Sequence, residues 1–268
     1  MRTQRQDRPG KRTDRQRNGD GRDRRGQPAP SEEWLYGRNG VGEALKAGRR
    51  RFHRLLVLDS AGGDPRLNDI DRRARDLGVR IERVDRDTLN RVVPDVNHQG
   101  VAALASPYPY APVDSVEHAT TSILALDHLV DPQNVGTLLR TAEALGIRTV
   151  LLPRDRAAGI TPAVVNSSAG AVEHLSIVQT VNLAQELERL KKRDYWIVGI
   201  EHHERASILG KTAIPTPCVL VIGSEGQGMG PNLAKRCDLL LKIEMQGKVN
   251  SLNAATAGAI ALFELNRN

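Results

Sequence analysis

The first half of the chain alternates short apolar runs with segments in which apolar residues recur every three or four positions. The runs are typical of strands, and the wider spacing is typical of amphipathic helices. Between residues 31 and 105 this pattern predicts strands over 54–59, 79–84 and 100–104 and helices over 40–46 and 66–77. Together these elements predict a small α/β domain.

The second half, residues 121–268, repeats the alternation with more strongly apolar strands. The predicted strands cover 122–126, 148–152, 196–200, 219–222 and 239–243. Helices are predicted between them, the first from Pro132 to a stop at Gly146, and a last one over about 250–265. Apolar strands separated by helices indicate a mostly parallel sheet covered on both faces, so this half is predicted to be a second α/β domain.

Two segments lack the alternation. Residues 106–120 begin with Ser106-Pro-Tyr-Pro-Tyr-Ala-Pro-Val113, whose three prolines favour an extended linker. Residues 1–30 contain ten Lys or Arg against four Asp and almost no apolar side chains. Such a segment cannot bury enough surface to offset the entropy of ordering, so a disordered basic tail is predicted there.

Composition restricts the class of protein further. The apolar runs are far shorter than the roughly 20 residues of a bilayer-spanning helix, and no secretory segment follows the Arg-rich start. We therefore expect a soluble cytoplasmic protein with no membrane partner. The net charge is +7, most of it in the tail. Arg-rich arms attract phosphate backbones, although a tail that only adds solubility has the same composition.

Metal and thiol chemistry have little support. Cys218 falls in a predicted buried strand and Cys237 precedes another, with no C-x-x-C pair or His cluster at zinc spacing. In Glu201-His-His-Glu204 the adjacent histidines would point to opposite faces of a strand. No metal is expected, and both cysteines are interpreted as small apolar fillers.

Three segments place polar residues where a predicted strand ends, which is where open α/β sheets bind ligands. They are Asp127-His-Leu-Val-Asp-Pro-Gln-Asn-Val-Gly-Thr-Leu-Leu-Arg140, Leu220-Val-Ile-Gly-Ser-Glu-Gly-Gln-Gly-Met229 and Ile243-Glu-Met-Gln-Gly-Lys-Val-Asn-Ser-Leu-Asn253. In this order they resemble the three signature motifs of the SpoU/TrmH branch of the SPOUT methyltransferases. Members of that family methylate ribose 2′-hydroxyls of RNA, with S-adenosylmethionine as the methyl donor.

The resemblance implies roles for particular residues, position by position. The implied catalytic residues are Asn134, which orders the site, Arg140, which engages the ribose, Glu225, Ser251 and Asn253. The implied cofactor contacts are Gly223, Ile243 and Leu252. The resemblance also implies a C-terminal SPOUT domain threaded into a deep trefoil knot, and a homodimer with the site near the subunit interface.

Simpler interpretations of the same residues stay open. Arg140 lies one helical turn from Glu143, so a surface ion pair is an alternative. Ser251 and Asn253 are residue types that cap helices, which is compatible with a role in the site. The loop after Gly223 lacks the G-x-G-x-x-G spacing of a dinucleotide site, which disfavours a phosphate cradle.

The smaller domain carries a resemblance of its own. Trp34-Leu-Tyr-Gly-Arg-Asn-Gly-Val41 and Asn97-His-Gln-Gly-Val101 resemble the RNA-binding domain, ribosomal-protein-L30e-like, that precedes the catalytic part in many SpoU enzymes. This domain order and the Asn-His-Gln-Gly run favour RlmB, the subgroup that methylates a guanosine of 23S ribosomal RNA. The alternatives are a transfer RNA ribose 2′-O-methyltransferase, a non-catalytic RNA-binding protein of the same fold and a nucleotide-dependent oxidoreductase.

The implied site contains no ordinary base. Asn134, Ser251 and Asn253 are neutral, and the guanidinium of Arg140 stays protonated. We therefore hypothesise that Arg140 stabilises the developing alkoxide or its adjacent phosphate. The hydroxyl proton would leave through Glu225, through water or through the RNA phosphate itself.

Overall fold

The computed structural model describes residues 32–59, 63–225 and 228–267. The predicted disordered tail, residues 1–30, lies outside the described residues. Two sheets organise the described part, one of four strands and one of seven. No helix within these ranges is long and apolar enough to cross a membrane.

The four-stranded sheet has the order β1-β4-β2-β3. Its strands are β1 (Glu33–Tyr36), β2 (Phe52–Leu58), β3 (Arg80–Val84) and β4 (Val101–Ala105). The accompanying helices are α1 (Arg38–Ala47), α2 (Pro65–Asp76) and α3 (Arg86–Val92). Asp64 and Asp85 cap α2 and α3 by accepting hydrogen bonds from backbone N–H groups of the first turn. The pattern analysis does not place β1 or α3, which have only four and seven residues.

The seven-stranded sheet has the order β7-β6-β5-β10-β8-β11-β9, and all of its described strand pairs are parallel. The predicted parallel α/β fold is thereby confirmed, and only β7 and β9 are strands that the pattern analysis does not place. The strands are β5 (Ile123–Leu126), β6 (Thr149–Pro153), β7 (Ser176–Thr180), β8 (Trp196–Ile200), β9 (Ser207–Ile208), β10 (Cys218–Ile222) and β11 (Leu239–Lys242).

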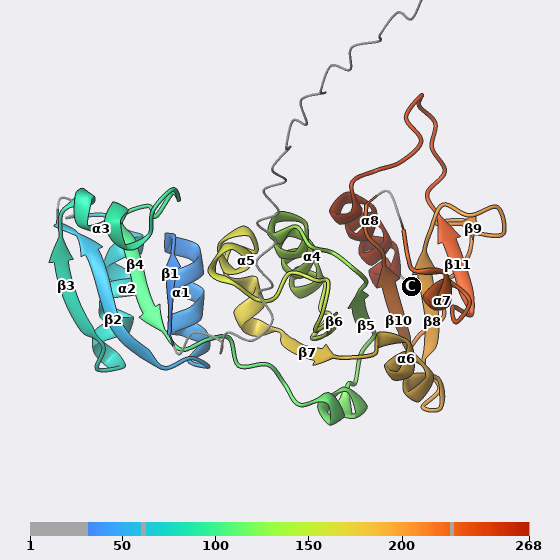
Figure 1. The fold of residues 1–268 in the computed structure, drawn as a ribbon, viewed down its shortest axis with the longest axis horizontal. Coiled ribbons are helices and arrows are strands. Elements are labelled where there is room, and N and C mark those ends of the chain that lie inside the picture. The colour runs from blue at the N-terminus through green and yellow to red at the C-terminus, as the bar shows by residue number, and fades with distance from the viewer. Residues whose placement is uncertain (1–31, 60–62, 226–227, 268) are drawn as a thin grey trace, which may run out of the picture. The chain divides into compact units, whose positions relative to one another are not determined.

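Helices cover both faces of this sheet (Figure 1). One face packs against α4 (Pro132–Ala144), α5 (Pro162–Ser167) and α8 (Ala254–Arg267). The other face packs against α6 (Leu183–Lys191), α7 (Pro231–Ala234) and the 3₁₀ helix η2 (Val113–His118). Strand residues alternate between the two cores, as the two-residue period of a strand requires.

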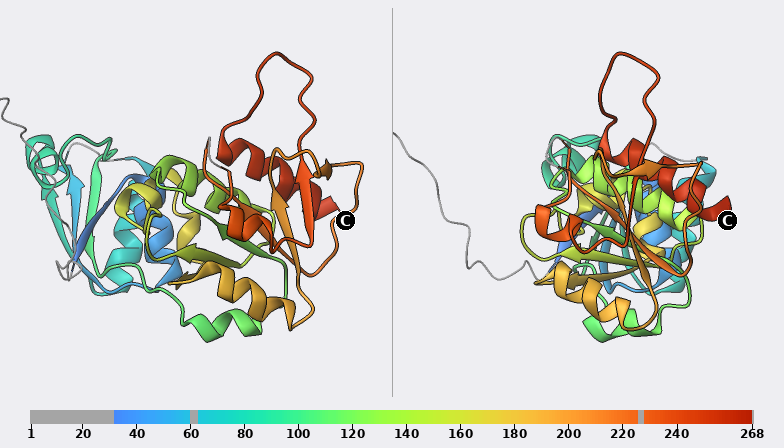
Figure 2. Two further views of the ribbon diagram at one scale, coloured as in Figure 1. Left: turned by 45° about the vertical axis from the view of Figure 1, so that its right-hand side comes forward. Right: turned by 90° about the vertical axis from the view of Figure 1, so that its right-hand side faces the viewer.

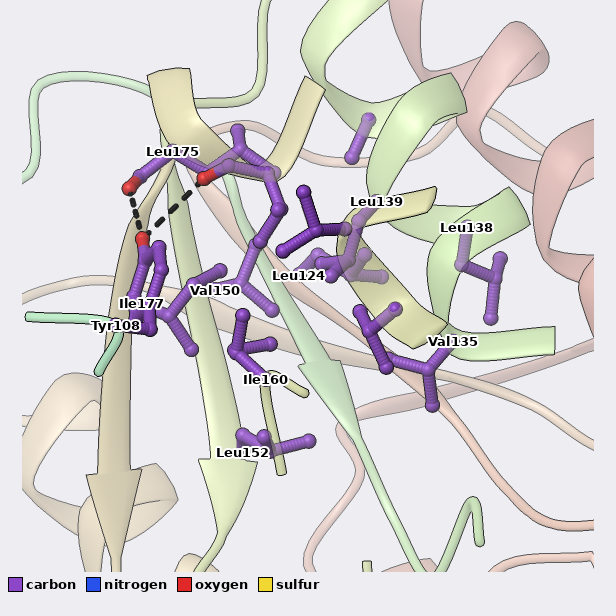
Figure 3. Packing of buried hydrophobic residues seen from close by; sticks show 14 of the residues in the cluster. Tyr108, Leu124, Val135, Leu138, Leu139, Val150, Leu152, Ile160, Leu175 and Ile177 are labelled. Carbon is purple, nitrogen blue, oxygen red and sulfur yellow. Dashed lines mark hydrogen bonds between the residues drawn. The ribbon is translucent and has the colours of Figure 1, made fainter. Parts of the chain in front are cut away.

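Helix α4 forms where the apolar spacing predicts it. Its buried positions include Val135, Leu138 and Leu139, which pack with Leu124 of β5 and Val150 of β6 (Figure 3). Asp131 caps the first turn by accepting a hydrogen bond from the N–H of Gln133 at 3.1 Å. Every side chain in this stripe is aliphatic, so the face is held by close packing rather than by polar contacts.

Two glycines let α4 approach its neighbours. A Cβ at Gly136 would lie 1.9 Å from Oγ of Ser167 in α5, and a Cβ at Gly258 of α8 would lie 2.3 Å from Cδ2 of Leu138. Neither distance is compatible with a real side-chain carbon. Gly136 therefore lets α4 approach α5, and Gly258 lets α8 approach α4.

The proline-rich segment after β4 is extended and lies against the second sheet. Ala111 forms an isolated parallel bridge with Val178 of β7. The hydroxyl of the buried Tyr108 donates a hydrogen bond to the carbonyl of Leu175 at 2.6 Å (Figure 3). This segment therefore packs on the second sheet rather than extending freely into solvent. The predicted domain boundaries at 105 and 120 stay predictions.

A buried cluster of charged side chains connects the four-stranded sheet to a 3₁₀ helix beside the seven-stranded sheet. Arg50, which is 5% exposed, precedes β2, and Glu173, which is fully buried, lies in the 3₁₀ helix η3 (Ala171–His174). The guanidinium contacts the Glu173 carboxylate at 3.1 Å through Nε and at 2.8 Å through Nη2. Its Nη1 contacts the carboxylate of Glu33 in β1. This cluster links the four-stranded sheet to the element that precedes β7.

Replacing Glu173 by Ala should destabilise the protein strongly. The substitution leaves most of the charge of Arg50 buried without its main partner, a change that costs about 3–5 kcal/mol. Denaturant unfolding measures the loss, with Glu143→Ala as the matched control, since Glu143 pairs with the exposed Arg148. Equal unfolding midpoints for the two variants would contradict the importance of the buried cluster.

Candidate active site

The candidate site lies at the carboxyl ends of four adjacent strands, β5, β10, β8 and β11. In parallel sheets this edge is where ligands bind, because the loops that leave neighbouring strands meet there. The loop between β11 and α8 stands out from the body of the protein beside this edge (Figure 2). The three motifs predicted from the sequence leave β5, β10 and β11 and so meet at the same place.

A cluster of three side chains joins these loops. Nδ2 of Asn134 donates to Oε1 of Glu225 at 3.0 Å. Nδ2 of Asn253 donates both to Oδ1 of Asn134, at 2.8 Å, and to Oε1 of Glu225. The backbone N–H of Ala254 also points at this carboxylate, at 3.3 Å. One carboxylate therefore connects the start of α4, the loop after β10 and the start of α8.

Asn253 is also the N-terminal cap of α8. Its Oδ1 accepts hydrogen bonds from the N–H groups of Ala255 and Thr256 at 2.9 and 3.1 Å. The cap and the contact with Glu225 use opposite ends of one amide, so capping is compatible with a role in the site, which stays a prediction. The expected start of the last helix at residue 250 is wrong, because this cap begins the helix at Ala254. Ser251 does not cap the helix and instead lines the pocket described below.

The loop after β10 is folded tightly on itself. Ser224 and Gly228 exchange two backbone hydrogen bonds of 3.0 Å, and Gly228 has φ of +62°. A Cβ at Gly223 would lie 2.3 Å from the carbonyl carbon of Gly228, so this position requires glycine. This turn holds Glu225 at the edge of the sheet.

Two further carboxylates fasten the far end of this loop. Oε2 of Glu201, just after β8, accepts from the N–H of Met229 at 2.7 Å. Oδ2 of the buried Asp127, just after β5, accepts from the N–H of Gly230 at 3.0 Å. The sequence analysis assigns no role to either residue. The available signal is the position of each acid directly after an apolar strand, at the ligand-binding edge.

The loops enclose a pocket. Its cavity volume is about 180 Å³, and it opens to solvent at its mouth. All three predicted cofactor contacts, Gly223, Ile243 and Leu252, line it, and so do Glu225 and Ser251. Its remaining walls combine apolar and polar residues: Ile200, Glu201, His202, Ile222, Ser224, Gly228, Lys242, Met245, Asn250, Ala254 and Ala257. Aliphatic walls with a few carboxylates suit a nucleoside with a cationic substituent.

The structure places Arg140 elsewhere. Arg140 lies further along α4 and lines a second hollow, together with Thr137 of the same helix and Phe263 of α8. The structure does not show the alternative ion pair between Arg140 and Glu143. Glu143 instead pairs with Arg148 at 3.2 Å. Arg140 therefore stands on the outer α4–α8 face, apart from the cluster of Asn134, Glu225 and Asn253.

Neither cysteine lines the pocket. Burial raises the pKa of the Cys237 thiol to about 12 and that of the Cys218 thiol to about 11. Both therefore stay protonated at neutral pH, as apolar fillers do. Among the described residues, no group of three or more His, Cys, Asp or Glu side chains is arranged to hold a metal ion.

Comparison with known proteins identifies the family. The model of the SpoU rRNA Methylase family matches residues 121–263, and the model for RNA 2′-O ribose methyltransferase substrate binding matches residues 34–111. The putative TrmH family tRNA/rRNA methyltransferase YacO of Bacillus subtilis is 36% identical over 88% of this chain and 95% of its own. An uncharacterized tRNA/rRNA methyltransferase of Synechocystis, slr0955, is 37% identical over 87% of this chain and 62% of its own.

Solved structures have the same fold. A putative TrmH-family RNA methyltransferase from Porphyromonas gingivalis superposes with a TM-score of 0.69 at 26% identity, covering 88% of this chain and 90% of that one. The SpoU methyltransferase AviRb of Streptomyces viridochromogenes, solved with S-adenosylmethionine, superposes with a TM-score of 0.73 at 23% identity and the same coverage.

The fold and the two family matches thus define an RNA 2′-O-ribose methyltransferase with an appended substrate-binding domain. The chain belongs to the SpoU methylase family. The family and enzyme class predicted from the sequence are confirmed. The RlmB subgroup is not resolved, since the curated relatives are named only as tRNA/rRNA methyltransferases. The trefoil knot stays a prediction.

The two roles of Asn253 can be separated by substitution. Asn253→Ala removes the helix cap and should cost about 1 kcal/mol of stability. Asn253→Ser keeps a capping oxygen, so its loss of stability should be only a few tenths of 1 kcal/mol. Both variants lose the amide that contacts Glu225. Denaturant unfolding of the two variants measures the difference. An equal loss of stability in both would show that Asn253 does not stabilise α8 as a cap.

Proposed function

We propose that this protein transfers a methyl group from S-adenosylmethionine to the ribose 2′-hydroxyl of a guanosine in 23S ribosomal RNA, in the cytoplasm. The observation that carries the proposal is the cluster of Asn134, Glu225 and Asn253 beside the pocket that Gly223, Ile243 and Leu252 line. It supports methyl transfer because it joins the three sequence motifs into one polar surface next to the pocket.

The pocket suits this cofactor. Ile243 and Leu252 supply aliphatic walls for an adenine, and Gly223 lets backbone groups approach a ligand closely. Ser251 and Glu225 supply polar groups to the pocket, and Glu225 also contacts Asn134. When bound, S-adenosylmethionine would supply a methyl carbon to the ribose oxygen: an O–C bond would form, the C–S bond would break, S-adenosylhomocysteine would leave as a neutral thioether, and the hydroxyl proton would pass to an acceptor.

The polar cluster positions the nucleophile. In-line transfer depends on orientation more than on acid–base strength, so amides held by a fixed carboxylate serve it well. Asn134 and Asn253 are both oriented by Oε1 of Glu225. No described residue donates a hydrogen bond to Oε2 of Glu225, which leaves that oxygen for the ribose hydroxyl and its proton. Water and the RNA phosphate are the other candidates as proton acceptors.

A second copy of the chain completes the site in this proposal. The α4–α8 face exposes Phe263 and Ile260, which are 55% and 37% exposed, beside the hollow that contains Arg140. Large apolar side chains on a helix face favour association. A homodimer through this face puts Arg140 at the subunit boundary, where its guanidinium stabilises the charge that develops on the ribose oxygen or its phosphate.

The RNA substrate is proposed from the domain layout. The domain formed by β1 to β4 matches a substrate-binding model of RNA 2′-O ribose methyltransferases, and the catalytic match is described as an rRNA methylase family. Mapping 2′-O-methyl groups on ribosomal and transfer RNA from a strain lacking this protein tests the assignment. Loss of one methylated guanosine from 23S RNA supports it, and loss of a transfer RNA methyl group instead contradicts it.

Replacing Arg140 by Ala should lower the turnover number by at least about 100-fold, as expected when a group that stabilises transition-state charge is removed. The affinity for S-adenosylmethionine should stay unchanged, since Arg140 lies outside the pocket. Methyl transfer to RNA and calorimetry of cofactor binding measure the two effects. Arg148→Ala is the matched control, because Arg148 only pairs with Glu143. Nearly normal turnover in Arg140→Ala would reject the assignment.

Replacing Phe263 by Glu should convert the dimer into a monomer, because a charge buried in an apolar interface is costly. Sedimentation velocity measures the change in mass. Val181→Glu is the control, since Val181 is an exposed apolar residue outside the α4–α8 face. A monomeric wild-type protein, or a Phe263→Glu variant that remains dimeric, would contradict the proposed interface.

A further inference from the structure

We propose that Glu201 is a cofactor-binding residue whose carboxylate accepts hydrogen bonds from the 2′- and 3′-hydroxyls of the cofactor's ribose. This inference rests on the proposed function and extends it to a residue that the three motifs do not contain. It starts from an acid that lines the pocket, follows the end of β8 and has one carboxylate oxygen to which no described residue donates a hydrogen bond.

The position of the Glu201 carboxylate is fixed by the loop after β10. Its Oε2 accepts from the N–H of Met229 at 2.7 Å. A Cβ at Gly228 would lie 2.3 and 2.4 Å from the two carboxylate oxygens, so the carboxylate packs directly on the backbone of that glycine. A side chain held on one side by an N–H group and on the other by a glycine backbone is preorganised for binding.

Among the residues that the structure describes, only Oε2 of this carboxylate accepts a hydrogen bond. No described residue donates a hydrogen bond to Oε1 of Glu201, while the residue is only partly buried and belongs to the pocket wall. A carboxylate is an acceptor only, so its natural ligand is a donor such as a hydroxyl. Among the parts of a nucleoside, the ribose diol offers two adjacent O–H donors to one carboxylate.

The strand order places the ribose, rather than the sulfonium, beside Glu201. Across the sheet edge the loops follow in the order Asn134 after β5, Glu225 after β10, Glu201 after β8 and Ile243 after β11. The reacting methyl group must face Asn134 and Glu225, where the polar cluster lies. An adenine against Ile243 then leaves the ribose over the end of β8. Neighbouring strands are about 4.8 Å apart, which matches the extent of one sugar ring.

Calorimetry with two ligands tests the contact without relying on activity. The probes are S-adenosylhomocysteine and its 2′,3′-dideoxyribose analogue, and the variants are Glu201→Gln and Glu201→Ala. Glu201→Gln keeps an oxygen for the N–H of Met229 but removes the charge. Glu204→Gln is the matched control, because Glu204 is an exposed acid of the same loop outside the pocket.

For S-adenosylhomocysteine, Glu201→Gln should weaken binding about 10-fold and Glu201→Ala about 10- to 100-fold, as expected for hydrogen bonds to a charged group. The dideoxy analogue should bind wild type and Glu201→Gln with the same affinity, because Glu201→Gln keeps the oxygen that holds the loop. Glu204→Gln should bind both ligands as wild type does. Unchanged affinity of Glu201→Gln for S-adenosylhomocysteine would overturn the inference.

A purely structural role for Glu201 gives a different pattern. If the residue only held the loop, Glu201→Ala would weaken both ligands by the same factor, and this result would also overturn the diol contact. Failure of the wild-type protein to bind S-adenosylhomocysteine would remove the proposed function and this inference together. Normal wild-type binding with unaffected variants would remove this inference alone.

Discussion

The hydrogen bonds that converge on the carboxylate of Glu225 hold the candidate site together. Asn134 from the start of α4, Asn253 from the loop before α8 and the first N–H of α8 all point at one oxygen of Glu225. A carboxylate that accepts several hydrogen bonds from fixed donors is held in one position. Through this contact three segments far apart in the sequence form a single surface, and the orientation of both amides depends on it.

The packing beneath the site makes this convergence possible. β5 and β10 are neighbours in the sheet, so the segments that follow them begin side by side. Gly258 and Leu138 let α8 lie close against α4, which brings the two helix starts together. Glu201 and Asp127 then hold the end of the glycine-rich loop through backbone N–H groups. The site is thus supported by helix packing below and by carboxylates at its rim.

Local patterns predicted much of this fold. The apolar stripe of α4, with Val135 and Leu138, and the apolar strands of the parallel sheet could be found because each shows its period within a few residues. β1 and β9 are too short to show a period. The start of α8 depends on the cap formed by Asn253. From the sequence, Ser251 could have formed that cap equally well.

Tertiary relations were less predictable. The motifs of the family pointed to Gly223, Ile243 and Leu252, and the structure brings all three into one pocket. For Glu201 and Asp127 the sequence offers only their position directly after an apolar strand, and a single acid there is not distinguished from a solvated charge until the neighbouring loop is in place. The separation of Arg140 from the pocket likewise follows from its direction on α4, which the spacing of the motif does not determine. A crystal structure of the protein with S-adenosylhomocysteine tests the central claim most directly. The account predicts the adenine between Ile243 and Leu252 and the sulfur facing an intact cluster of Asn134, Glu225 and Asn253; a ligand bound elsewhere, or a cluster whose members lie apart, would contradict it.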